Sequence, residues 1–126
     1  MLPRDADELL TKLIKLCPPF ASAWARDAYL WTDDTGATTF HGVFAGLSHH
    51  VVERLALAPA AELKPLFELV EEILIADRDR DEPLGNAAAT CFLENVVGDS
   101  VPDADLLPLL GTESTKYCKL YGLTTT

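Results

Sequence analysis

The chain is poor in basic residues, cysteine and methionine, and it contains no long apolar run. Lysine and arginine together contribute 10 of 126 residues, against 20 aspartates and glutamates, so the formal net charge is −10. Nucleic acids and anionic membranes repel such a chain, and neither is expected as a direct partner. Charged residues interrupt the apolar stretches well before membrane-spanning length, and no apolar core of a signal peptide follows the first residues.

The three cysteines, Cys17, Cys91 and Cys118, are widely spaced and odd in number. No pair has the spacing of metal ligands, and Cys91 falls on a helix that the pattern predicts to be buried. We interpret the cysteines as small buried side chains in a reducing compartment, which predicts a cytoplasmic protein. Cys118 has no histidine near it in sequence, so no cysteine nucleophile with a neighbouring base is expected.

Hydrophobic residues make up 48% of the chain, and their spacing is helical. We predict an all-α fold in which residues 1–126 form one domain, a bundle of about six to seven helices arranged as antiparallel hairpins. The central hairpin covers about residues 60–98. Its first helix begins near Ala60, and its second helix covers residues 83–97 and is apolar nearly all round. A helix with so little polar surface is packed on several sides, so it is predicted to be the central helix.

The other helices are predicted from their caps and from proline and glycine. Asp81 or Glu82 is expected to cap the second helix of the hairpin. Residues 32–36 form a turn, which we interpret as the loop between two helices; a short hairpin of strands 29–31 and 38–40 is the alternative. Further helices are expected from Asp5 or Asp7 to Leu16, over residues 19–30, from Thr38 or Thr39 to Pro59, over residues 104–110 with Asp103 as cap, and from Thr112 onward.

The net charge is concentrated in one part of the chain. Residues 62–113 hold thirteen acidic and three basic residues, a net charge of −10, whereas the remainder is neutral. Such a surface either keeps a small protein in solution or attracts a basic partner. Ile75 lies on the side of three glutamates, as a second-layer core contact or as an apolar anchor ringed by acids. The predicted partner-binding residues are Glu68, Glu71, Glu72, Ile75, Asp77, Asp79, Asp81 and Glu82.

Two clusters suggest a metal site but lack the full set of ligands. His49, beside His50, shares the outer face of a helix with Glu53, yet zinc needs at least three protein ligands, so an exposed helix pair is expected. The aspartates of residues 77–81 match the first positions of a calcium loop. The sixth and twelfth positions then lack the required glycine and glutamate. No metal and no cofactor is predicted.

Two acids on otherwise apolar faces are candidates for a special role. Asp27 lies among aromatic residues and is interpreted as a structural acid with its hydrogen bonds satisfied. Glu94 is the one acid on the predicted central helix. A structural hydrogen bond to neighbouring backbone, a place in a partner site and a catalytic acid are the three roles open to it. General acid catalysis needs a carboxyl group shifted by burial in a cleft, and no such constellation is visible, so no enzyme is predicted.

Three segments look familiar: PLFELVEEIL at residues 65–74, NAAATCFLEN at 86–95 and LLGTESTKY at 109–117. The core at residues 92–94 and the turn Leu110-Gly111-x-x-Ser114 carry the match, and Thr39-Phe40-x-Gly42-x-Phe44 is similar too. Together they cover most of residues 39–121. They resemble a family of small all-helical bacterial proteins, largely of unknown function, which includes immunity proteins of polymorphic-toxin and contact-dependent growth inhibition systems. The resemblance implies a protein that neutralises a cognate toxin by occlusion, and it transfers no catalytic residues.

The negative charge and the family resemblance both indicate an inhibitor of a basic protein. A nuclease toxin carries a basic substrate face, which an acidic inhibitor covers as a phosphate mimic. We therefore expect a cytoplasmic immunity protein that binds and blocks a basic toxin domain. The alternative is a helical scaffold or regulatory adaptor whose acids only keep it in solution.

Overall fold

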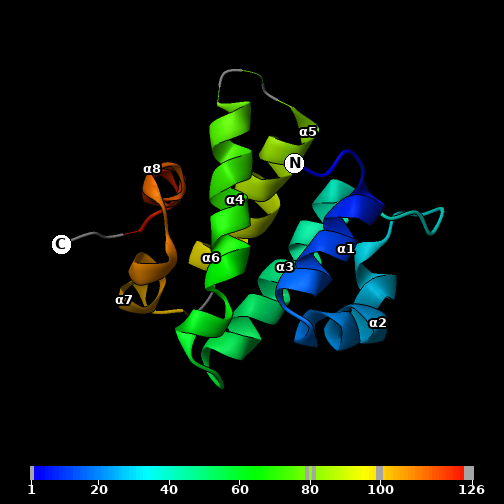
Figure 1. Cartoon of the computed structure of the whole chain (residues 1–126), viewed down its shortest axis with the longest axis horizontal. Coiled ribbons are helices and arrows are strands. Elements are labelled where there is room, and N and C mark those ends of the chain that lie inside the picture. Colours follow the sequence, from blue (N-terminus) through cyan, green and yellow to red (C-terminus); the bar gives the residue numbers. More distant parts are fainter. Residues whose placement is uncertain (1, 79, 81, 99–100, 124–126) are drawn as a thin grey trace.

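The computed structural model describes residues 2–78, 80, 82–98 and 101–123, and over these ranges the chain is all-α, with no strand. In Figure 1, α4 stands in front, with α7 and α8 on one side of it and α1 and α2 on the other. The predicted fold class is confirmed. The elements are α1 (Ala6–Leu16), α2 (Pro19–Trp31), α3 (Phe40–Leu55), a 3-10 turn (Ala60–Glu62), α4 (Lys64–Asp77), α5 (Pro83–Ala87), a π-helical turn (Ala88–Leu93), α6 (Glu94–Gly98), α7 (Asp103–Leu106), a 3-10 turn (Leu107–Leu109) and α8 (Thr112–Leu120).

Helices α1 and α3 begin at predicted caps. Asp5 accepts a hydrogen bond from the backbone N–H of Glu8 (2.9 Å), and the hydroxyl of Thr39 accepts one from the N–H of Gly42 (3.0 Å). Between α2 and α3, the carboxylate of Asp33 accepts two backbone N–H groups of the turn. Residues 29–40 therefore form a helix–loop–helix as predicted, and the alternative strand hairpin is wrong.

The predicted central helix lies at the middle of the core. The segments α5, π turn and α6 run on from one another, and in Figure 1 they return antiparallel to α4 and behind it. Phe92 in the π turn is fully buried, and its ring packs against those of Phe44 on α3 and Phe67 on α4, with centroids 6.0 and 5.2 Å apart. One connected hydrophobic cluster joins these helices, so the aromatic side chain of Phe92 ties the hairpin to α3.

Close packing of α2 on α3 depends on glycine. A Cβ atom on Gly42 would overlap the backbone carbonyl of Trp31, and one on Gly46 would lie 2.9 Å from the Trp31 indole and 3.2 Å from that of Trp24. Glycine at both positions therefore allows the two helices to approach.

One further predicted cap holds in position, and another is wrong. Glu82 occupies the predicted N-cap position of α5, although its side chain makes no capping hydrogen bond. Its backbone N–H donates to the Asp77 carboxylate at the end of α4. Asp103 is the first residue of α7 rather than its cap, which is Pro102. The expected helix over residues 104–110 is also divided, since Pro108 has no N–H for the next α-helical hydrogen bond and a 3-10 turn follows α7.

Candidate functional site

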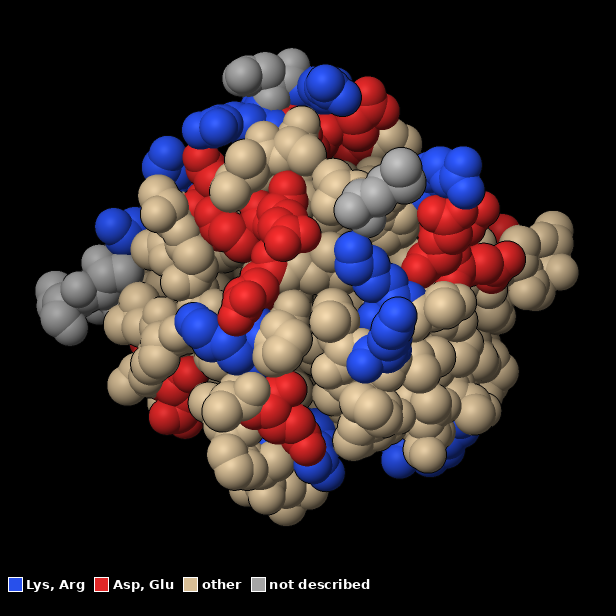
Figure 2. Space-filling view, in the orientation of Figure 1, with Lys and Arg blue, Asp and Glu red and all other residues tan. Residues whose placement is uncertain are grey.

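Glu68, Glu72 and Ile75 lie on one exposed side of α4, which we call the α4 face. Their spacing of four and three residues stacks them over two turns, and the opposite side of α4 is buried in the core. Ile75 keeps 47% of its surface exposed, so it is not a second-layer core contact. Figure 2 shows a stripe of acidic side chains over α4, with basic side chains around it.

Glu71 does not belong to this exposed face. One carboxylate oxygen accepts the backbone N–H of Glu113 (2.8 Å), and the other accepts the N–H and hydroxyl of Ser114 (2.9 and 2.8 Å). Burial raises the pKa of the Glu71 carboxyl, but the hydrogen bonds from Ser114 and Glu113 outweigh burial and hold the pKa below its ordinary value. Glu71 therefore caps α8 across the bundle instead of presenting a free acid to a partner.

The carboxylate of Asp77 is likewise occupied by a hydrogen bond within the chain. Its Oδ1 accepts the backbone N–H of Glu82 at 2.8 Å, and its carboxylate lies where a Cβ atom on residue 85 would be. The close approach explains the glycine at that position. Glu82 itself is exposed, whereas the predicted contacts Asp79 and Asp81 lie outside the described residues.

The negative charge of residues 62–113 is partly compensated and does not form a single flank. Glu113 is buried and lies 3.2 Å from the guanidinium of Arg78 and 3.6 Å from the ammonium of Lys116. Glu62 pairs with Arg54 at 2.7 Å. The free acidic surface is thus smaller than the residue count suggests. Among the described residues of 62–113, its exposed acids are Glu68 and Glu72 on the α4 face, Glu82, Glu94 and Asp105.

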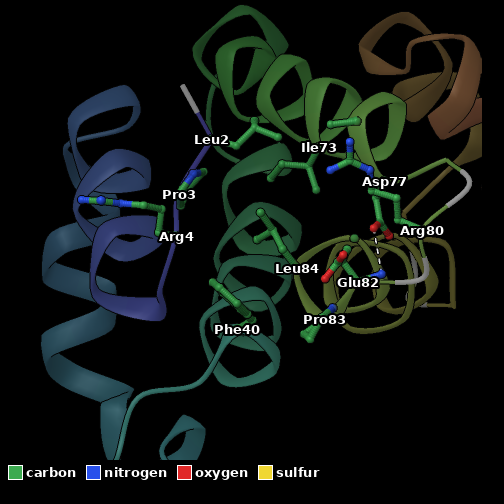
Figure 3. Close-up of a pocket in the computed structure, with 12 residues that line it drawn as sticks. Leu2, Pro3, Arg4, Phe40, Ile73, Asp77, Arg80, Glu82, Pro83 and Leu84 are labelled. Carbon is green, nitrogen blue, oxygen red and sulfur yellow. Dashed lines mark hydrogen bonds between the residues drawn. The ribbon is translucent and has the colours of Figure 1, made fainter.

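A hollow of about 380 Å³ opens at the C-terminal end of α4, between the N-terminal segment, the end of α4 and the start of α5 (Figure 3). Its wall is apolar, formed by Leu2, Phe40, Ile73 and Leu84. Arg80 and Glu82 lie at its edge, whereas Arg4 points away and pairs with Glu8 (3.0 Å). An apolar wall with charges of both signs at its edge suits the side chain of a protein partner.

The pair His49–Glu53 is confirmed as an exposed pair on one helix, with 3.1 Å between Nε2 and Oε1. Arg26 lies 3.6 Å from Glu53 and 2.8 Å from Asp27, and its hydrogen bond lowers the pKa of the Asp27 carboxyl below its ordinary value. The structural interpretation of Asp27 is therefore confirmed. Across the described ranges, no group of three His, Cys, Asp or Glu side chains could hold a metal ion.

Glu94 is exposed and lines a surface hollow of about 450 Å³ together with Trp31 and His49. An exposed carboxylate does not have the dry surroundings that general acid catalysis uses.

The structure also contains a cysteine–histidine pair that the sequence analysis missed. Cys91 is half-buried rather than buried, and its Sγ lies 3.0 Å from Nδ1 of His41 at the start of α3. The two residues are 50 positions apart, so no local pattern in the sequence indicates the contact.

Comparison with protein-family models, with curated proteins and with solved structures finds no match to the chain. In the described part of the chain, no helix combines the length and apolar character needed to cross a membrane.

Proposed function

We propose that this chain binds a basic protein through the α4 face, and that it is an immunity protein whose partner is a toxin domain. The exposed Ile75 beside Glu68 and Glu72 carries the proposal, because an apolar side chain among carboxylates is a typical anchor for a basic surface. The acids steer the partner toward the face, and Ile75 provides the apolar contact once water is excluded.

The hollow at the C-terminal end of α4 is a further part of the proposed binding surface. An interface of standard size buries about 800 Å² on each partner, which is more than two turns of one helix offer. The half-buried side chains of Phe40 and Leu84 in its wall, with Glu82 at its edge, provide further contact area for a basic and apolar segment. Asp79 and Asp81 remain predicted contacts, whereas Glu71 and Asp77 are excluded as free contacts because they already bind backbone N–H groups.

The resemblance to immunity proteins supports a toxin as the partner, and the acidic surface supports a basic one such as a nuclease. The inhibitor occludes the toxin: carboxylates of the α4 face occupy the place of substrate phosphates. Such an inhibitor acts in the cytoplasm, where the toxin meets its substrate.

The test uses charge reversal at two exposed acids. The double variant Glu68→Lys/Glu72→Lys is compared with the control Asp34→Lys/Glu94→Lys, which changes the net charge equally at exposed acids away from α4. The binding probe is the C-terminal domain encoded by the gene immediately upstream, made inactive by substitution at its catalytic residue. We expect the α4 variant to associate roughly tenfold or more slowly at low salt and to lose most of the salt dependence of its rate.

The control variant is expected to retain most of the association rate. Equal slowing by both double variants would mean that only net charge matters and would overturn the assignment of the face. Ile75→Ala gives a separate test, since loss of the anchor speeds dissociation with little effect on association.

A scaffold or regulatory adaptor is the second candidate, favoured by the exposed apolar residues Tyr29 and Leu30 on α2, which are 76% and 55% exposed. An upstream gene without a toxin-like domain supports this candidate. So does a partner whose binding is weakened by Tyr29→Ser/Leu30→Ser and unaffected by charge reversal on α4.

A further inference from the structure

Cys91 and His41 are placed as a nucleophile and a base. The 3.0 Å between Sγ and Nδ1 lies within hydrogen-bonding reach, so the imidazole can accept the thiol proton. Cys91 comes from the π turn and His41 from the first turn of α3, and packing of these two elements holds the pair together. In cysteine nucleophiles of proteins, a histidine within this distance commonly serves as the base.

The Cys91 thiol is accessible to solvent, whereas the thiols of Cys17 and Cys118 are not. His41 is exposed and Cys91 half-buried, with the Thr90 hydroxyl 3.7 Å from Sγ. Cys17 and Cys118 are buried; burial raises the pKa of the Cys17 thiol, and it raises that of Cys118 to about 12. The molecule therefore contains one thiol with a base and access to solvent, and two internal controls that are held protonated.

The π turn over Ala88–Leu93 is a second feature that indicates a functional site at Cys91. A π turn takes more residues than an α turn, so the side chains that follow are rotated from their α-helical positions, and such turns occur frequently at functional sites. Cys91 lies within this turn, on a stretch that an α-helical pattern predicts to be buried.

We propose that Cys91 and His41 form a reactive thiol–imidazole pair, and that Cys91 undergoes exchange with small disulfides. His41 takes the thiol proton, and the Cys91 thiolate attacks one sulfur of the disulfide. A mixed disulfide forms at Cys91, the original disulfide bond breaks, and the departing thiolate takes the proton from the His41 imidazolium. Electrons balance without an added oxidant, because the small disulfide is the oxidised reactant. The modification does not depend on the proposed toxin partner.

A small disulfide fits better than a protein disulfide. Cys91 is half-buried, with the imidazole 3.0 Å and the Thr90 hydroxyl 3.7 Å from Sγ, so the attacked sulfur has to approach a partly covered side chain. A flexible, low-molecular-weight molecule such as glutathione disulfide can do so without displacing helices, and it serves as the probe.

The experiment follows adduct formation in the full-length native chain. The reduced protein is mixed with glutathione disulfide at pH 7 without oxygen and quenched with acid, and the adduct at each cysteine is quantified by peptide mass spectrometry. We expect native Cys91 to react at least about tenfold faster than the same residue in the guanidinium-unfolded chain, where it has no partner. Cys17 and Cys118 are expected to react far more slowly in the native chain than in the unfolded one.

His41→Gln tests the base, with His49→Gln as matched control, since His49 is another exposed histidine of α3 and contacts Glu53 instead. His41→Gln is expected to lower the Cys91 rate constant by about tenfold or more, and His49→Gln to leave it unchanged. A native rate at or below the unfolded rate would overturn the proposal, as would an unchanged rate in a folded His41→Gln protein. The comparison of native and unfolded wild type decides the matter if His41→Gln fails to fold.

Discussion

Glu71 on α4 and Ser114 on α8 are 43 residues apart in sequence and joined by two hydrogen bonds, from the Ser114 N–H at 2.9 Å and its hydroxyl at 2.8 Å. The same carboxylate also accepts the N–H of Glu113. An α-helix begins with N–H groups that lack partners, and Gly111 at the N-cap of α8 has no side chain to supply one. Glu71, from the neighbouring helix α4, therefore caps α8 in place of a local side chain. The same hydrogen bonds join α8 to the hairpin.

Removing the Glu71 carboxylate is expected to destabilise the protein. Glu71→Ala leaves two N–H groups and a hydroxyl without their acceptor at a partly buried helix start. This loss should lower the free energy of unfolding by about 1–3 kcal/mol. Glu72→Ala, the exposed neighbour, is the matched control and should change stability by less than about 0.5 kcal/mol. Urea denaturation of the two variants measures both values; equal losses would mean that the cap contributes nothing.

The contribution of Glu71 depends on pH. Its pKa in the folded chain lies below the ordinary value, so its stabilising effect is complete above the pKa of an unfolded glutamate, about 4.3, and is lost as the pH falls through the lower folded pKa. The difference in unfolding free energy between wild type and Glu71→Gln should therefore be constant from pH 7 to 5 and shrink below pH 4. A difference that stays constant to acid pH would contradict the role of the carboxylate.

Spacing within each helix makes much of the fold predictable. The apolar steps in α4 and the nearly uniform apolar character around Phe92 depend on neighbours along one chain segment, and both indicate burial correctly. The caps Asp5 and Thr39 follow for the same reason, because a cap contacts N–H groups only two or three residues away.

Contacts between distant segments are what the sequence could not provide. Glu71 has the spacing of an exposed acid, and only the position of α8 shows that its oxygens are occupied. Asp77 is similar, since the turn after α4 brings the start of α5 onto its carboxylate. The same applies to Cys91, where the fold brings a histidine from α3 to the thiol. Charge counted along the chain therefore overstates the free acidic surface.

Adding a single methyl group at Gly42 should lower the free energy of unfolding. A Cβ atom there meets the backbone carbonyl of Trp31, which cannot rotate away as a side chain would, so α2 and α3 must separate. Gly42→Ala is expected to lower the free energy of unfolding by about 1–3 kcal/mol. Gly98→Ala is the control, because nothing lies within 4 Å of a Cβ atom at residue 98. Thermal unfolding compares the two; a stability loss of the same size at both positions would contradict the steric explanation.

Buried His50 should make stability fall in mildly acidic solution. Its ring lies 5.5 Å from that of Phe20, between centroids, and 3.9 Å from the sulfur of Cys17. Burial, reinforced by the charge of Arg54, holds the pKa of His50 below its ordinary value.

The unfolded chain therefore takes up a proton at residue 50 at a higher pH than the folded chain does. The free energy of unfolding consequently decreases as the pH falls below about 6.5, the ordinary histidine pKa, and the decrease ends below the folded pKa. In His50→Leu this part of the pH dependence should disappear between pH 7 and 5, whatever the variant's stability at pH 7. Urea denaturation at closely spaced pH values measures the slope for both proteins. Identical slopes would mean that His50 is not the group whose protonation opposes folding.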